Sequence, residues 1–378
     1  MKTLMQKAKP GKRTPKKPGK IQRSRLARWF ASLPDWLKIA LRSKLFKIVV
    51  ILSVLVYTFM WTGGTWFDFI RFPKVADPNY GVSFSAKRAK ELGLDPHANL
   101  TALLSDMKIK NYRLMSYWDE VEANRGTFDF SELDWEINEV AKYSGTVSLS
   151  IGLRQPRWPE CHAPSWAFEL KGNAWKQALF AYMEVVVKRY EKNGTVINWQ
   201  LENEGVNTWF GTCDQPDRQR LNEEFNLVRD WSKKPIWMSL SDQHGYPVNQ
   251  PTPDKFGYSV YRWVWNNKLP PSGTYLIYPT PVWYHRLRAV IIKAYTGKDI
   301  FIHELQLEPW GPKDIKDLSV DEQNISMSLQ QIHDSLSYAR EIGAKDIYTW
   351  GGEWWYWRMV NGDPSVWNKV KYELETQR

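Results

Sequence analysis

The segment 198–205 reads NWQLENEG, and it begins as a strand in a protein core would. Ile197, Trp199 and Leu201 place apolar side chains at alternate positions, which is the period of a β-strand. Positions 202–204, Glu-Asn-Glu, then bring two carboxyl groups and an amide to the end of the same run. Because buried charges need partners, a buried strand that ends in this way predicts a functional site at its end.

The chain contains seven further predicted strands, some before this one and some after it, and helical segments lie between most of them. The eight predicted strands are 81–85, 111–116, 146–152, 196–204, 236–241, 257–264, 300–306 and 346–350. Segments such as 173–190 and 326–342 show the helical period between them. Eight strands alternating with helices predict an α/β fold, a (β/α)8 barrel over residues 78–378. A doubly wound sheet shares this alternation but more often has a glycine-rich phosphate loop after its first strand, and none occurs here.

Two glutamates on this predicted barrel form a candidate catalytic pair. Glu204 ends the fourth strand and Glu304 lies on the seventh, so their side chains are expected to face each other across the barrel mouth. Retaining hydrolysis of a glycosidic bond uses two carboxyl groups about 5–5.5 Å apart. One is the nucleophile, and the other is a proton donor of raised pKa. This chemistry needs no cofactor, and no metal-binding spacing of His, Cys, Asp or Glu stands out in the sequence.

Three segments carry a resemblance to a known group of enzymes. WQLENEG (199–205) resembles the strand-four motif of family 35 and family 42 β-galactosidases, and HELQLEPW (303–310) resembles the strand-seven pattern of family 10 xylanases. YWDEVEANRGTFDFSELD (117–134) is similar to the segment after strand two in families 42, 10 and 5. The chain therefore resembles the retaining glycoside hydrolases of clan A over about residues 78–370, and the motifs favour no single family.

The resemblance implies roles for five residues. Glu204 would be the acid/base, and Glu304 would be the nucleophile. Asn203 would hydrogen-bond the 2-hydroxyl of the sugar, and Arg113 would support the nucleophile. Trp350 would form the floor of the first sugar site.

Further residues near the strand ends are candidates for substrate binding. The resemblance implies a strand-six tyrosine in contact with the nucleophile, and both Tyr258 and Tyr261 fit that description. Trp118, Trp158 and Trp354 follow predicted strands and could stack on a sugar face, although core packing would explain a tryptophan equally well.

The charge of the chain is concentrated at its beginning. Residues 1–47 hold 15 Lys or Arg and one Asp, a net charge of +14, so the remainder carries −3 of the total of +11. Such a basic tail suits anionic lipid headgroups, and we expect no specific nucleic-acid partner. Within the tail, 32–46 has the pattern of an amphipathic helix lying beside a membrane.

An uncharged run of 20 residues, 48–67, follows the tail between Lys47 and Asp68. This length crosses a hydrocarbon core of about 30 Å, so the run predicts a single transmembrane signal anchor. A cleaved signal peptide is the alternative, but the segment before it is very long and no small-residue cleavage pattern follows. The basic tail then stays in the cytoplasm, and the barrel lies outside the cell.

The chain has only two cysteines, Cys161 and Cys213. They follow the third and fourth predicted strands, in loops that are neighbours at one barrel face. In an exported domain they are expected to form a disulfide.

Together these patterns predict a membrane-anchored retaining β-glycoside hydrolase that acts on an oligo- or polysaccharide. The alternative is an inactive, carbohydrate-binding barrel displayed on the cell surface. The presence of the glutamate pair, Asn203 and Arg113 argues against that alternative, since an inactive barrel need not keep all four.

Overall fold

The computed structural model describes residues 34, 43–67, 77–208, 210–213, 217–240, 244–269 and 273–376, without the side chains of 45 and 59–67. The chain divides into two compact units, 1–63 and 64–378. Most of the predicted basic tail, 1–47, and most of its amphipathic helix lie outside the described residues.

Helix α3, Lys44–Phe67, contains the run in which we predicted a signal anchor. Its apolar side chains from Ile48 to Tyr57 are exposed, with Ile51 and Val56 at 57% and 59%. Within the described residues, no helix combines the length and hydropathy of a membrane span.

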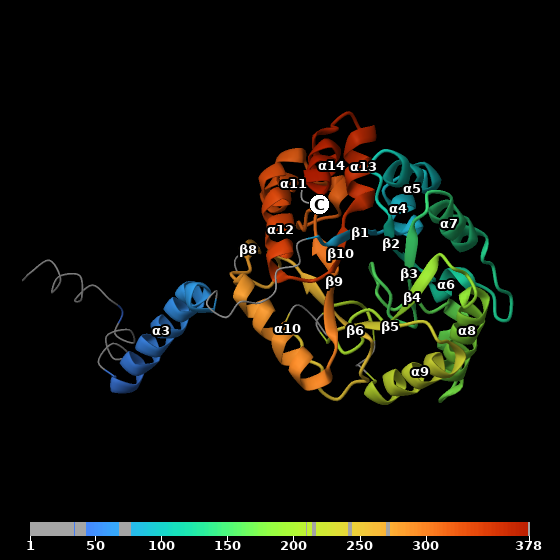
Figure 1. Ribbon diagram of the computed structural model, residues 1–378, viewed down its shortest axis with the longest axis horizontal. Helices are drawn as coiled ribbons and strands as arrows, with labels where there is room; N and C mark the ends of the chain where they lie inside the picture. Colours follow the sequence, from blue (N-terminus) through green and yellow to red (C-terminus); the bar gives the residue numbers. More distant parts are fainter. Residues whose placement is uncertain are drawn as a thin grey trace, which may run out of the picture. The chain divides into compact units, whose positions relative to one another are not determined.

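Eight parallel strands close into a barrel, which confirms the predicted (β/α)8 architecture (Figure 1). The strands are β1 Asn79–Ser83, β2 Asn111–Met115, β3 Thr146–Ile151, β4 Val196–Leu201, β5 Ile236–Ser239, β6 Lys255–Val260, β9 Asp299–Gln306 and β10 Asp346–Trp350. Their order around the barrel is β1-β10-β9-β6-β5-β4-β3-β2. The first strand therefore pairs with the last, as closure of the barrel requires.

Helices form the outer ring around the barrel (Figure 1). They are α4 Ala86–Glu91, α5 Pro96–Ser105, α6 Trp118–Val121, α7 Ser131–Lys142, α8 Ala174–Tyr190, α9 Arg218–Trp231, α10 Val282–Thr296, α11 Val320–Ser326, α12 Leu329–Ile342, α13 Gly352–Val360 and α14 Ser365–Thr376, with 3₁₀ turns at Ser165–Glu169 and Ile315–Asp317. Local sequence sets their ends. Ser328 and Gln331 form a capping box at the start of α12, and Gly343 ends this helix with a φ of 88° that glycine adopts without strain.

Most predicted strands match the observed bounds to within two residues, but two of them end three or more residues earlier than predicted, at the barrel mouth. The predicted strand 257–264 is interrupted after Val260, and β7 (Trp263–Asn266) pairs antiparallel with β8 (Thr274–Ile277) as a separate hairpin. The predicted strand 196–204 stops at Leu201, because Glu202 and Glu204 adopt left-handed φ angles of 53° and 47°. These angles leave the β region, so the chain turns at the point where the carboxyl groups begin.

Candidate active site

The backbone after β4 places the Glu204 carboxyl group inside a cage of donors. The backbone N–H of Glu204 donates to Ser239 Oγ at 2.6 Å. Oε1 accepts from Ser259 Oγ at 2.9 Å, and Oε2 accepts from Asn207 Nδ2 at 2.5 Å. Burial and the negative charge of Glu304 raise the pKa of Glu204 to about 8, although the two side-chain hydrogen bonds oppose the rise. Glu204 is therefore protonated at neutral pH and can donate a proton.

A β-bulge presents Glu304 to the interior. Tyr258 and Ser259 of β6 pair with Ile302 and Glu304 of β9, which leaves His303 as an extra residue. The register between β9 and β10 shifts at the same place. Bulges of this kind redirect side chains and are common beside active sites. Here the bulge turns the carboxyl group toward a permanent cation.

Glu304 is held in its charged form. Its Oε1 accepts from Arg113 Nη1 at 3.1 Å, and Oε2 accepts from the Tyr261 hydroxyl at 2.9 Å. His303 Nδ1 lies 3.4 Å from Oε1. Burial raises the pKa of Glu304, but His303, Arg113 and Tyr261 together lower it below its usual range. Arg113 is the permanent charge among them, because burial lowers the pKa of His303.

Arg113 joins the site to the barrel interior. It is fully buried, and besides Glu304 it donates to Asn203 Oδ1 at 2.7 Å, to Ser83 Oγ at 3.3 Å and to Gln200 Oε1. A guanidinium with several partners holds each of them in one geometry. Arg113 therefore orients both the carboxylate of Glu304 and the amide beside Glu204.

Glu160 is a third carboxyl group in the site that the sequence analysis missed. It is 3% exposed, and its Oε2 accepts from Asn203 Nδ2 at 2.9 Å. Burial and the charges of Glu304 and Glu204 raise its pKa well above the usual range, against the lowering effect of Arg154. Glu160 and Arg113 thus fix the amide of Asn203 from its two ends.

Glu202 has a structural role at the turn after β4. Its carboxylate accepts from the backbone N–H groups of Leu153 and Arg154 at 2.6 and 3.0 Å, and from Arg220 at 2.9 Å. Gly152 makes this approach possible, because a Cβ atom there would lie 2.4 Å from Glu202 Oε1. The interaction ties the ends of β3 and β4 together.

The carboxylate pair, Glu204 and Glu304, opens into a cleft of about 790 Å³. Its aromatic lining includes Tyr261, Trp158, Phe210, Trp265, Trp310 and Trp350. Trp158 is 57% exposed, and its ring packs edge-on against Phe210. The size and lining fall within the usual range of small-molecule sites.

A charged cluster supports one wall of the cleft. The guanidinium of Arg157 donates to Glu308 and Glu353, each at 2.6 Å, and lies 4.0 Å from the centre of the Trp350 ring. Trp350 Nε1 in turn donates to Glu308 at 2.8 Å. Charge-assisted contacts with Arg157 and Glu308 therefore hold the Trp350 ring in one orientation and fix this wall of the cleft.

Two of the tryptophans predicted to bind substrate lie away from the cleft. Trp118 is fully buried, stacks on Tyr182 and donates to Glu122. Trp354 is fully buried in α13 and donates to Gln323. For these two tryptophans the core alternative is the correct one, since position just after a strand does not decide which way a ring points.

The two strand-six tyrosines have different places. Tyr258 precedes Ser259 on β6 and therefore points to the opposite face of the strand, where its ring lies 4.2 Å from the guanidinium of Arg288 on α10. Tyr261 follows the end of β6 and reaches Glu304. The prediction of Tyr258 as a binding residue is thus wrong, and Tyr261 is the tyrosine that contacts the proposed nucleophile.

Tyr261→Phe is expected to lower kcat/KM by about 10- to 100-fold, because a hydrogen bond to a charged group contributes about 1.5–3 kcal/mol. Tyr258→Phe is the matched control, since no hydrogen-bond partner of the Tyr258 hydroxyl occurs among the described residues. Steady-state kinetics of both variants check this. Equal losses in the two would contradict the assignment.

Cys161 and Cys213 form a disulfide with a Cα–Cα distance of 5.4 Å, which confirms the predicted pair. The bond joins the loop after β3, which carries Trp158 and Glu160, to the loop after β4, which carries Phe210. Two walls of the cleft are therefore covalently connected.

Comparison of the sequence with protein-family models and with curated proteins gives no match. Comparison of the structure with solved structures gives matches to several glycoside hydrolases. An endo-β-1,4-xylanase of glycoside hydrolase family 10 from Gloeophyllum trabeum is 14% identical, with a TM-score of 0.51 over 80% of this chain and 99% of that one. A β-galactosidase from Halorubrum lacusprofundi is 12% identical, with a TM-score of 0.50 over 79% of this chain and 58% of that one.

A third neighbour is a GH5_18 protein from Streptomyces cattleya, solved in complex with GlcNAc. It is 10% identical, with a TM-score of 0.50 over 72% of this chain and 70% of that one. At these identities the likeness shows the fold. The barrel has the fold of the clan A glycoside hydrolases, as the sequence motifs predicted.

Proposed function

We propose that the protein is a retaining β-glycoside hydrolase. The observation that carries this proposal is the carboxylate pair at the barrel mouth, in which Glu204 accepts from the neutral groups of Ser259 and Asn207 while Glu304 contacts the cation of Arg113. Burial raises the pKa of Glu204, and the surroundings of Glu304 lower its pKa. Two carboxyl groups with pKa values pushed apart are the requirement for a proton donor and a nucleophile in one site. The inactive-barrel alternative gives no reason for this separation.

In the proposed reaction, Glu304 attacks the anomeric carbon and forms a covalent ester while the bond to the leaving oxygen breaks. Glu204 gives its proton to that oxygen. Glu204, now ionised, then takes a proton from water, and the resulting hydroxide displaces Glu304 from the same carbon. Two inversions give net retention. Arg113 and Tyr261 hold Glu304 during both steps.

The substrate class that fits the cleft is an oligo- or polysaccharide. Aromatic rings present flat apolar faces to pyranose rings, and the exposed face of Trp158 extends this lining to the outer part of the cleft. Arg88, Glu91 and Lys313 add polar groups for hydroxyl contacts.

Turnover of a panel of aryl β-glycosides and polysaccharides tests the proposal. Proton NMR of the first product formed should show the β-anomer before mutarotation. An α-anomeric first product would exclude double displacement, and no hydrolysis of any member would count against the enzyme assignment.

The pH profile of kcat/KM is expected to fall as the pH rises through about 8, because Glu204 must be protonated to donate. On the acid side, activity should persist below the usual range of a glutamate, since Glu304 must be ionised and its pKa is lowered. Glu204→Gln removes the titrating group, so the alkaline limb should disappear with an activated substrate. An alkaline limb that persists in this variant would assign it to another group.

We also propose that residues 48–67 anchor the protein in a membrane, with the basic tail inside the cell and the barrel outside. The proposal is supported by the uncharged run and by the +14 charge before it. Protease added to intact cells should digest the barrel and spare the tail. Protection of the barrel would contradict this topology.

A further inference from the structure

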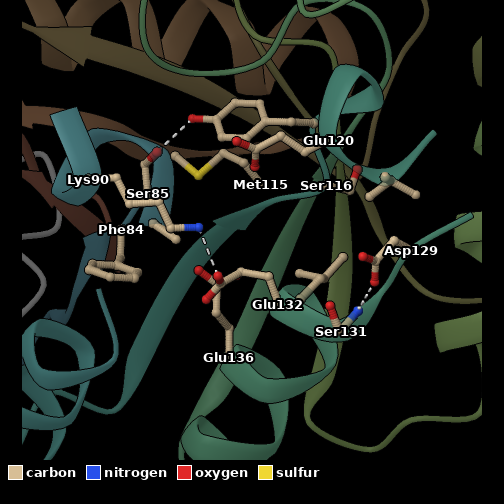
Figure 2. A pocket seen from close by; sticks show the side chains of 14 residues that line it. Phe84, Ser85, Lys90, Met115, Ser116, Glu120, Asp129, Ser131, Glu132 and Glu136 are labelled. Carbon is tan, nitrogen blue, oxygen red and sulfur yellow. Dashed lines mark hydrogen bonds and ion pairs between the residues drawn. The ribbon is translucent and has the colours of Figure 1, made fainter. Parts of the chain in front are cut away.

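A second cavity, of about 350 Å³, lies beside the ends of β1 and β2, between α4, α6 and α7 (Figure 2). It has no lining residue in common with the catalytic cleft. The volume falls at the lower end of the range of ligand sites, about 300–1,000 Å³. Neither the proposed reaction nor the sequence motifs account for it.

One buried carboxyl group opens into this cavity without a partner. Glu136 of α7 is 5% exposed and lines the cavity, and Figure 2 shows it beside Glu132 at the lower wall. No described residue donates a hydrogen bond to it or pairs with its charge. Its oxygens are not among the fully buried atoms that lack a partner, so they remain accessible from the cavity. Glu136 therefore has the free acceptor capacity that a ligand would use.

The charges around the cavity favour a cation. Glu120, Asp129, Glu132 and Glu136 line it, and Lys90 is the only cation among its lining residues. Lys90 Nζ is already committed to Glu132 at 2.9 Å (Figure 2). Glu136 is therefore left in a negative field with no positive charge of its own.

The chemistry of the walls indicates what kind of cation would fit. Phe84, Met115 and Leu133 are buried and give the cavity an apolar side. No group of three or more His, Cys, Asp or Glu among the described residues has the arrangement of a metal site. We propose that this cavity binds a primary ammonium group carried on a short apolar chain, with Glu136 as its counter-ion.

Binding of such a ligand should release a proton. Burial, with added repulsion from Glu132 and Glu120, raises the pKa of Glu136 well above its usual range, and Lys90 opposes this only partly. An ammonium group beside Glu136 favours the carboxylate, so the proton of the empty site is lost on binding. An amine that bound only to exposed carboxylates would release no proton, because those groups are already ionised.

The test is calorimetry of the full-length protein with n-butylammonium, and with n-butanol as the uncharged control. Butylammonium should bind, with an enthalpy that differs between phosphate and Tris buffers because a proton is released, and n-butanol should bind much more weakly. Glu136→Gln should weaken butylammonium binding by about 10- to 100-fold, the value of a charged hydrogen bond, and abolish the buffer dependence.

Glu139→Gln is the matched control on the same helix. Glu139 is also buried, at 7% exposed, but it lies outside the cavity lining and accepts from Lys142 at 2.5 Å. This variant should bind butylammonium as the unmodified protein does. Absence of binding to the unmodified protein, equal binding of n-butanol, or equal weakening in both variants would overturn the proposal. None of these outcomes depends on glycosidase activity.

Discussion

Glu304→Gln is expected to lose more than about 10⁴-fold in kcat on every glycoside substrate, which corresponds to about 5.5 kcal/mol of activation free energy. The amide is a poor nucleophile, so the covalent intermediate cannot form. An activated leaving group should not restore the rate. It removes the need for protonation of the leaving oxygen, but the reaction still lacks its nucleophile. Steady-state rates on aryl glycosides with good and poor leaving groups measure this.

Stability must be followed in the same variant, because Glu304 pairs with the buried Arg113 and breaking such a pair can cost about 3–5 kcal/mol. Glu373→Gln is the matched control. Glu373 is a buried carboxyl group of α14, 2% exposed and paired with Lys369 and His333 outside the cleft. It should lose stability without losing turnover. Comparable turnover in both folded variants would remove Glu304 from the proposed role.

Glu204→Ala should show a loss that depends on the leaving group. General acid–base help contributes about 10²–10⁴-fold, so poor leaving groups should suffer a loss of that size. A dinitrophenolate departs without protonation, so it should still load Glu304 rapidly. The second step is then slow, because water has lost its base.

Azide provides the second part of this experiment. It is an anionic nucleophile that needs no base, so it should restore turnover of the dinitrophenyl substrate and give a β-glycosyl azide. Equal losses on both substrate classes without azide rescue would show that Glu204 is not the acid/base. Glu160, the other buried protonated carboxyl group of the cleft, would then be the next residue to replace.

The period-two and helical patterns predicted all eight barrel strands and their alternation with helices, because a buried parallel strand and an amphipathic helix each follow from side-chain burial alone. Strand ends were less predictable. The run 257–264 keeps a β-favouring composition of Tyr, Val and Trp on both sides of Arg262, so its pattern does not show that β6 stops at Val260 and a hairpin begins. Likewise, the left-handed turn at Glu202 and Glu204 depends on Ser239 and on donors after β3, which are distant in sequence.

The site shows the same division. The carboxylate pair could be found from strand position, since the barrel places both at one mouth. Glu160 could not, because it is brought to Asn203 by a loop with left-handed φ angles at Arg157 and Glu160, and no short motif marks it. Tyr258 lies within β6 and faces Arg288, whereas Tyr261 follows the end of the strand and reaches Glu304, and the sequence does not mark where that strand ends.

The most direct measurement of the central claim is identification of the residue that becomes glycosylated. A 2,4-dinitrophenyl 2-deoxy-2-fluoro-β-glycoside traps the covalent intermediate of a retaining enzyme. The fluorine slows both steps, because it disfavours the oxocarbenium-like transition state. The dinitrophenolate leaving group compensates only in the first step, so the glycosyl-enzyme forms quickly and is hydrolysed slowly. The sugar from the best aryl glycoside of the panel should be used. Peptide mass mapping should then show one fluoroglycosyl group, attached to Glu304. Attachment to Glu204 or Glu160, or turnover of the parent glycoside without any adduct and with an inverted product, would contradict the account.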